Sequence, residues 1–252
     1  MSEPGQSSRL TIEYDGSGFC GWARQPGVRT VQEELERALA VVLRRTERVA
    51  LTVAGRTDTG VHAWGQVASY EGPPASVRSL NALLPDDVAV LSCVEAPPGF
   101  DARRWATSRA YCYRVLARPG RAALEHGRVL HWPGKLDVDA LNACATALVG
   151  THDFTAFTPA ETYHVRFERD VFGAHWRPDG SCLEFWIEGD TFMRQMIRVL
   201  VGTMLQVGSG RRSVEDFVAL LSGAPRTAAG PTAPPSGLYL AGVGYGGERV
   251  LA

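Results

Sequence analysis

The stretch AGRTDTGVHAWGQV, residues Ala54 to Val67, places one carboxylate, Asp58, among two threonines and two glycines. Arg56 lies two residues before that carboxylate. Two unrelated chemistries use such a pattern, and they come with different folds. Asp-Thr-Gly is the signature of aspartic proteases, whose lobes are almost entirely β. An Arg-Thr-Asp turn beside basic residues instead suggests a protein that acts on a nucleic acid, so the rest of the chain must decide.

The protease interpretation fails on chemistry and on fold. That mechanism needs two carboxylates that share one proton, and this sequence has a single Asp-Thr-Gly motif. Arg56 would hold Asp58 ionised. Apolar residues also recur with helical spacing in several segments, which excludes an almost all-β protein. We therefore reject the protease.

Composition is that of a folded globular chain. Its 252 residues are 45% hydrophobic and 21% charged, enough for one large domain or two small ones. Five cysteines without C-x-x-C spacing predict reduced thiols rather than a disulfide framework or a zinc site. The N-terminal sequence has no apolar signal segment, and no apolar run could span a bilayer. We expect a soluble, cytoplasmic protein with no membrane partner.

Charge leaves two explanations open. The net charge is −1, which does not indicate a nucleic-acid binder. Yet Lys135 is the single lysine among 26 basic residues, and the planar fork of arginine suits phosphates and base edges. A GC-rich genome would produce the same bias. An RNA binder with this balance would need its positive charge gathered on one face.

Hydrophobic periodicity predicts the order strand, helix, strand, strand, helix, strand in both halves of the chain. In the first half these segments are RLTIEYDG, TVQEELERALAVVLRR, VALTVA, GQVASY, SVRSLNALL and VAVLSCVE. In the second half they are AYCYRVLA, LDVDALNACATALVG, ERDVFGAHWR, CLEFWIEG, TFMRQMIRVLVGTMLQVG and LYLAGVGY, with SVEDFVALLSG as an extra helix. Thr30 with Glu33 and Ser213 with Asp216 are capping-box signals.

This order is that of the ferredoxin-like arrangement. We predict an α+β fold of two ferredoxin-like (βαββαβ) halves, whose antiparallel sheets lie side by side around a central cleft. Prolines and a glycine near EAPPGFDARR suggest the boundary. Residues 1–100 would carry the Asp58 loop, and residues 101–252 would carry Tyr111 and Arg198.

Several side chains could join Asp58 in a site. Tyr111 and Tyr113 share one face of a predicted strand, where they are either core residues or a platform for a base. Arg194 and Arg198 lie one turn apart on a predicted apolar helix. A buried arginine needs a carboxylate partner, and Asp58 is the candidate. The histidines show no metal-ligand spacing, and no phosphate-binding loop is present, so we expect neither metal nor nucleotide cofactor.

Taken together, these segments resemble the tRNA pseudouridine synthase A family almost from end to end. The likeness rests on IEYDGSGFCGWARQPGVRTVQEELERAL, AGRTDTGVHAWGQV, FDARRWATSRAYCYRV, GTHDFTAF, FMRQMIRVLVGTMLQVG and GLYL, in this order. Where the family usually has alanine, this chain has Thr59, whose hydroxyl could bond Asp58. Val199 replaces a commonly polar residue.

The resemblance implies that Asp58 is the catalytic aspartate. Tyr111 would stack on the target uracil and assist proton removal, and Arg198 would pair with Asp58. Arg56 would hold the target nucleotide out of its stem, and Leu238 would line the uracil pocket. We take five further residues as candidate RNA contacts: Arg24, His62, Gln66, Arg109 and Arg194.

The implied reaction converts uridine to pseudouridine at positions 38 to 40 of the tRNA anticodon stem-loop, without cofactor or metal, in a homodimer. A non-catalytic RNA-binding protein on the same scaffold is the competing hypothesis, although binding alone has no use for a lone carboxylate near phosphates. A synthase that acts on other RNAs is a third. Residue identity leaves open whether Asp58 attacks C1′ or removes the 2′ hydrogen.

Overall fold

The computed structural model describes residues 5–162 and 164–251 and divides the chain into two compact units. Unit 1 comprises Met1–Arg109 and Tyr239–Val250, and unit 2 comprises Ala110–Leu238 with Leu251–Ala252. The boundary predicted at residue 100 differs from this division in two respects. Unit 1 continues to Arg109, and it also takes back a segment from near the C-terminus.

Unit 1 is built around strand β1 (Ser7–Tyr14). It pairs antiparallel with β3 (His62–Glu71) on one side and with β4 (Val88–Ala96) on the other. The second edge of β3 carries β2 (Thr52–Val53), antiparallel, and β10 (Leu238–Tyr245), parallel. The apolar alternation in β1 explains its central place, because burying every second side chain fixes which face meets the core.

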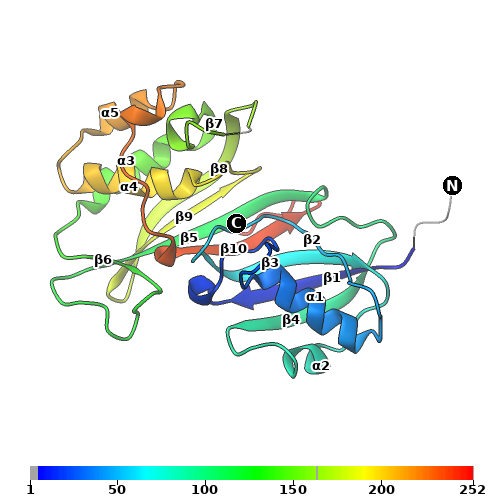
Figure 1. Cartoon of the computed structure of the whole chain (residues 1–252). Helices are drawn as coiled ribbons and strands as arrows, with labels where there is room; N and C mark the ends of the chain where they lie inside the picture. The colour runs from blue at the N-terminus through cyan, green and yellow to red at the C-terminus, as the bar shows by residue number, and fades with distance from the viewer. Residues whose placement is uncertain (1–4, 163, 252) are drawn as a thin grey trace. The chain divides into compact units, whose positions relative to one another are not determined.

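Two helices accompany these strands in unit 1. They are α1 (Val31–Val42) and α2 (Val77–Asn81), which lie next to each other and are drawn in blue and cyan in Figure 1. The predicted capping box at Thr30 does not form, because its side chain makes no cap hydrogen bond. Helix α1 is instead held by its buried apolar stripe of Val31, Leu35 and Leu39.

In unit 2, most of β5 (Ala106–Ala117) pairs with β9 (Cys182–Gly189), and β9 pairs with β8 (Glu168–Asp179). The outer edge of β8 holds β7 (Gly150–Asp153), and β5 also pairs in parallel with β6 (Leu130–Trp132). The sequence did not predict β6 or β7, which are short and lack an alternating pattern.

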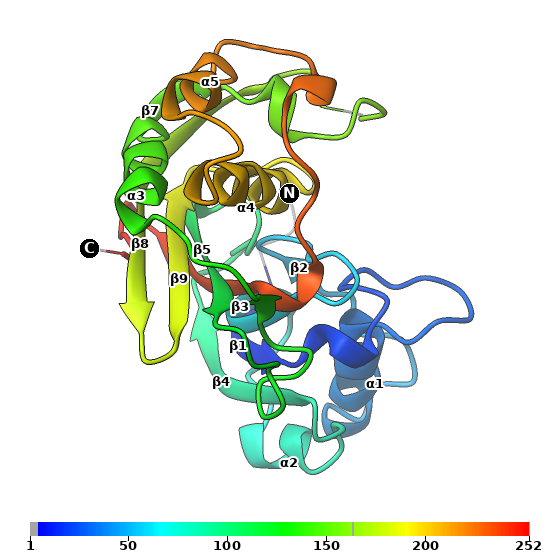
Figure 2. The ribbon, with the colours of Figure 1, turned by 90° about the vertical axis from the view of Figure 1, so that its left-hand side faces the viewer.

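The helices of unit 2 are α3 (Val138–Ala147), α4 (Met196–Gly208) and α5 (Val214–Ala219), with α3 packed against β8 and α4 (Figure 2). Ser213 caps α5 by accepting from the Asp216 amide, as predicted. Short 3-10 helices are η1 (Gly16–Gly18), η2 (Thr155–Phe157), η3 (Arg226–Ala228) and η4 (Pro235–Gly237).

One predicted helix boundary is wrong. Helix α4 begins at Met196, because the residue before it, Gln195, has a left-handed backbone with φ of 59°. Arg194 therefore precedes the helix and does not share a helical face with Arg198.

Both units combine helices with mostly antiparallel strands, which confirms the α+β class. Over the described ranges 5–162 and 164–251, no helix combines the length and hydrophobicity needed to cross a membrane.

The cysteines provide a test of the core. Cys112 and Cys144 are buried, whereas Cys20 and Cys93 are half-buried, and all are free thiols. Burial raises the pKa of the Cys144 thiol to about 12 and raises that of Cys112 as well. A raised pKa lowers the thiolate fraction at pH 8, and the thiolate is the nucleophile.

We therefore expect iodoacetamide at pH 8 to label Cys20 and Cys93 first, and to reach Cys112 and Cys144 only after unfolding in urea. Peptide mass spectrometry over time measures the order. Labelling of Cys144 in the folded protein at the rate of Cys20 would contradict this core.

Candidate active site

The segment Ala54–Val61, which we call the Asp58 loop, connects β2 to β3 in unit 1. Its C-terminal part is a β-turn in which the Val61 amide donates to the Asp58 carbonyl at 3.1 Å. Gly60, the third residue of this turn, has φ of 77°, a conformation that favours glycine. The glycine of the Asp-Thr-Gly motif therefore serves the turn. A protease mechanism is not needed to explain it.

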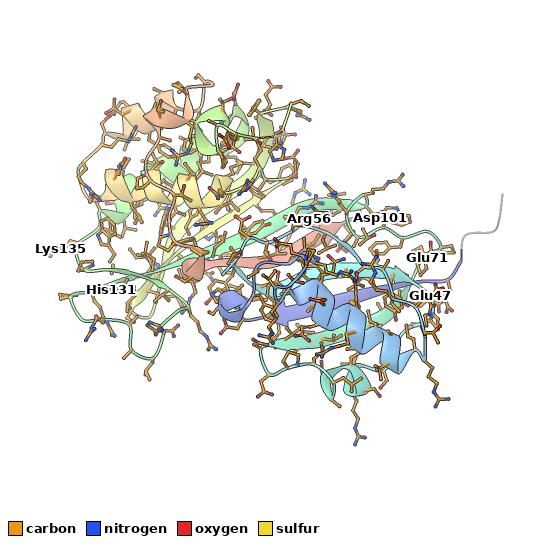
Figure 3. The ribbon with its side chains drawn as sticks, viewed as in Figure 1. Glu47, Arg56, Glu71, Asp101, His131 and Lys135 are labelled. Carbon is orange, nitrogen blue, oxygen red and sulfur yellow. The ribbon has the colours of Figure 1, made fainter. Side chains whose placement is uncertain are left out.

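Side chains of the loop differ in their exposure. Arg56 and Thr59 are exposed, Asp58 is half-buried, and Thr57 between them is buried. Figure 3 labels Arg56 on the segment before β3. The hydroxyls of Thr57 and Tyr14 are 2.7 Å apart, and the Thr57 carbonyl accepts from the Trp22 amide at 3.0 Å. The loop thus has an exposed cation and a half-buried carboxylate on either side of a buried, hydrogen-bonded residue.

Two glycines let the chain after β1 approach the Asp58 loop closely. A Cβ on Gly16 would lie 2.0 Å from the Val61 carbonyl oxygen, so no other residue fits there. Gly21 has φ of 85°, and a Cβ on it would lie 2.9 Å from the Thr57 carbonyl oxygen. The segment YDGSGFCGW and the Asp58 loop are therefore parts of one structure in unit 1.

Arg109, a candidate RNA contact, faces the protein interior. It is 9% exposed. Its guanidinium donates to the Ala54 carbonyl at 2.9 and 3.2 Å, and to the carbonyls of Arg103 and Ala106 at 3.0 and 3.2 Å. These bonds hold the first residue of the Asp58 loop. They favour a structural role, and contact with RNA stays a prediction.

Gln66 and His62 are also buried, on β3. Gln66 donates to the Gly55 carbonyl at 2.7 Å. His62 stacks on Tyr239 with ring centroids 4.6 Å apart. Gln66 thus supports the Asp58 loop, whereas His62 packs against Tyr239, and direct RNA contact by either residue stays a prediction.

The His62 ring lies between the backbone of Gly16 and the side chain of Asp15. Its Nδ1 lies 3.0 Å from the Gly16 amide and 3.2 Å from an oxygen of Asp15. The same oxygen of Asp15 accepts from the Ser17 amide at 3.0 Å.

Arg24 is the other exposed candidate of unit 1. Its backbone amide donates to Gln32 at the start of α1, at 3.2 Å. Nearby Arg29 grips both carboxylate oxygens of Asp87 at 2.7 and 2.8 Å, which raises the pKa of Arg29. The loop that carries Arg24 is thereby tied to the start of β4.

In unit 2, Tyr111 on β5 is 8% exposed and meets Phe192 edge to face, with centroids 5.4 Å apart. Tyr113 is fully buried, and its hydroxyl donates to the Pro234 carbonyl at 2.8 Å. Tyr113 is thus a core residue, and burial raises its pKa. The stacking role of Tyr111 stays a prediction.

Arg198 on α4 is bound to the segment before β10. Its Nε donates to the Ala233 carbonyl at 2.7 Å, and the Ala233 amide donates to the Arg198 carbonyl at 3.0 Å. A Cβ on Gly202 would lie 1.8 Å from the Pro231 carbonyl oxygen, so α4 and this segment touch through backbone. Leu238, the first residue of β10, is buried a few residues later. Pairing of Arg198 with Asp58 stays a prediction.

The remaining predicted positions fall as follows. Arg194 is exposed, and its carbonyl accepts from the Thr158 hydroxyl at 3.3 Å. Val199 is fully buried in the core of unit 2. Sequence reasoning missed Tyr14, Thr57 and Trp22. The only signal for them was that Tyr14 falls on the apolar face of its strand. In the part of the chain that the structure describes, no three His, Cys, Asp or Glu side chains gather to hold a metal.

Comparison with known proteins finds close relatives over nearly the whole chain. A family described as tRNA pseudouridine synthase matches residues 144–246. The tRNA pseudouridine synthase A of Bacillus pumilus is 39% identical over 242 residues, covering 94% of this chain and 98% of the relative. Its namesake in Myxococcus xanthus is 42% identical over 245 residues, covering 94% and 91%. That of Frankia casuarinae is 44% identical over 254 residues, covering 97% and 91%.

The structural role of Arg109 is testable without RNA. Arg109→Lys keeps the charge, but one ammonium cannot bond the three carbonyls that the guanidinium spans. We expect the free energy of unfolding to fall by about 2 kcal/mol, the cost of leaving a buried polar group unpaired. Urea unfolding measures it, with exposed Arg104→Lys as the control. Equal stability of the two variants would contradict the role.

Proposed function

The chain belongs to the tRNA pseudouridine synthase A family, and on that premise we propose that Asp58 carries the conversion of uridine to pseudouridine in tRNA. Membership makes the protein an isomerase that acts on tRNA uridine. The observation that supports a catalytic role for Asp58 is the structure of the loop that carries it. A half-buried carboxylate stands beside an exposed arginine on backbone that is bonded at Ala54, Gly55, Thr57 and Asp58.

Such a loop suits the reaction. The bond between N1 and C1′ breaks, the detached uracil turns, and C5 bonds to C1′ while the hydrogen on C5 leaves as a proton. N1 gains a proton, so atoms balance without any cofactor. A carboxylate fixed in direction either attacks C1′ or removes the 2′ hydrogen, and both require that the reacting atoms be held in place.

We propose that the substrate is the anticodon stem-loop of tRNA, at positions 38 to 40. A stem nucleotide shields its glycosidic bond inside the helix, so the base must first be extruded. Arg56 is exposed and lies two residues before Asp58 in the sequence. Its guanidinium is therefore well placed to hold the extruded nucleotide by its phosphate. The protein recognises its RNA by shape and by backbone contacts, because side chains cannot read the narrow major groove of A-form RNA.

The unit 2 residues complete the proposal. Tyr111 stacks on the uracil and takes up a proton, Leu238 lines the pocket, and Arg198 pairs with Asp58. Support comes from their placement in buried or half-buried positions of β5, β10 and α4. We also propose that each tRNA contacts both subunits of a homodimer.

The finer fold is part of the proposal as well. Within unit 1, the antiparallel pairing of β1 with β3 and β4, and of β2 with β3, supports a ferredoxin-like half. The order β5, α3, β8, β9, α4 and β10 along the chain supports a second one, although β10 from Tyr239 onward is grouped with unit 1. We expect the two halves to border the cleft that receives the RNA.

The reaction itself can be measured directly. With tRNA transcribed from 5-³H-uridine, wild-type protein should release tritium, because forming the C5–C1′ bond expels that hydrogen. Asp58→Asn should release none above background while tRNA binding by filter retention is unchanged. Release by Asp58→Asn at the wild-type rate would overturn the role of Asp58. Tight binding without release by either protein would indicate a binding protein.

Arg56→Ala separates positioning from affinity. Because Arg56 would orient one nucleotide within a large RNA interface, we expect turnover at saturating tRNA to slow about tenfold. The dissociation constant for tRNA should rise by less than about threefold, since many other phosphate contacts remain. A variant that binds far more weakly yet turns over normally at saturation would contradict this assignment.

A further inference from the structure

We infer that Tyr14 and Gln66 are positioning residues, which set the direction of Asp58 and Arg56 through buried hydrogen bonds to the inner side of the Asp58 loop. The inference rests on the proposed catalytic role of Asp58. It adds Tyr14, from β1, to the site, and it gives Gln66 on β3, predicted above as an RNA contact, a different role.

The bonds form a short chain beneath the loop. Gln66 Nε2 lies 2.7 Å from the Gly55 carbonyl and 3.4 Å from the Tyr14 hydroxyl, and that hydroxyl lies 2.7 Å from Thr57 Oγ1. Gln66 is fully buried, and Tyr14 and Thr57 are 5% and 7% exposed. Away from water, each of these bonds is hard to replace once it is lost.

Donors and acceptors determine how Gln66 takes part in this chain. Gln66 Oε1 accepts from the Val67 amide at 3.2 Å, which leaves Nε2 to face Gly55 and Tyr14. Because Nε2 can only donate, the Tyr14 oxygen accepts there. The hydroxyl hydrogen of Tyr14 is then available to Thr57 Oγ1.

Thr57 is held at two points, and this is what fixes its neighbours. Tyr14 holds its side chain, while the Trp22 amide holds its carbonyl at 3.0 Å. The peptide that joins Thr57 to Asp58 therefore cannot rotate without breaking one of these bonds. Gln66 holds the carbonyl of Gly55, the residue before Arg56. The side chains of Arg56 and Asp58 are thus both attached next to restrained backbone.

Another tyrosine of unit 1 offers a matched comparison. Tyr70 on β3 is 4% exposed, and its hydroxyl bonds the Pro73 carbonyl at 2.8 Å and the Ala75 amide at 3.0 Å. It fastens a loop that carries none of the proposed site residues. Removing either hydroxyl costs a similar buried bond, but only Tyr14 is connected to the Asp58 loop.

The experiment measures single-turnover tritium release from 5-³H-uridine tRNA over a range of enzyme concentrations. For Tyr14→Phe we expect the rate at saturating enzyme to fall about tenfold, and for Thr57→Val up to about a hundredfold, since small misplacements of reacting groups have effects of this size. The half-saturating concentration should change less than twofold. Tyr70→Phe should keep the wild-type rate, and Thr57→Ser, which retains a hydroxyl, should recover most of it.

The outcomes separate positioning from simple packing. Equal rates for Tyr14→Phe and Tyr70→Phe, or equal losses in Thr57→Val and Thr57→Ser, would overturn the inference. A Tyr14→Phe defect confined to the half-saturating concentration would overturn it too. If Thr57→Val does not fold, the two Tyr→Phe variants decide, because both keep the ring and its packing.

Asp58→Asn, measured in the same series, distinguishes this inference from the proposed function. Full release by Asp58→Asn overturns both. No release by Asp58→Asn with an undiminished rate for Tyr14→Phe overturns the positioning role alone. No release by Asp58→Asn with the predicted loss in Tyr14→Phe supports both.

Discussion

The register of β1 against β3 is the constraint on which the rest of unit 1 depends. Ile12 lies opposite Gln66 and Tyr14 opposite Ala63, so β3 carries an extra residue between these pairs. The resulting bulge contains Gly65, where a Cβ would lie 2.7 Å from the Ala241 carbonyl oxygen. A slip of one residue would turn Tyr14 to the opposite face. The Asp58 loop would then lose its inner support.

Arginine serves two purposes in this chain, and this bears on the ambiguous composition. The guanidinium of Arg29 binds both carboxylate oxygens of Asp87, and that of Arg109 binds backbone carbonyls. Arg24, Arg56 and Arg194 are exposed. Part of the arginine bias is therefore structural, which neither codon usage nor RNA binding alone would suggest. A net charge near zero gives little information about the surface when cations are used internally.

The sequence predicted the α+β class and most elements, because alternation in strands and capping at Ser213 are local signals. It failed where the deciding contact is distant in the chain. The start of α4 depends on the left-handed backbone at Gln195, and β6 and β7 form by pairing with β5 and β8. In the site, the Asp58 motif was recognisable, but the burial of Arg109, Gln66 and His62 was not, and their contact with RNA stays a prediction. Burial of a polar side chain depends on which strands pair, and strand pairing cannot be deduced from local sequence patterns.

The parallel pairing of β10 with β3 also has a consequence for biosynthesis. Tyr239, which stacks on His62 and Trp64, is synthesised at least 175 residues (239 − 64) after both of its partners. A nascent chain that lacks residues 239–250 cannot complete the sheet edge beside the Asp58 loop. The sheet edge of unit 1 is therefore completed only after residues 110–238, which make up most of unit 2, have been synthesised.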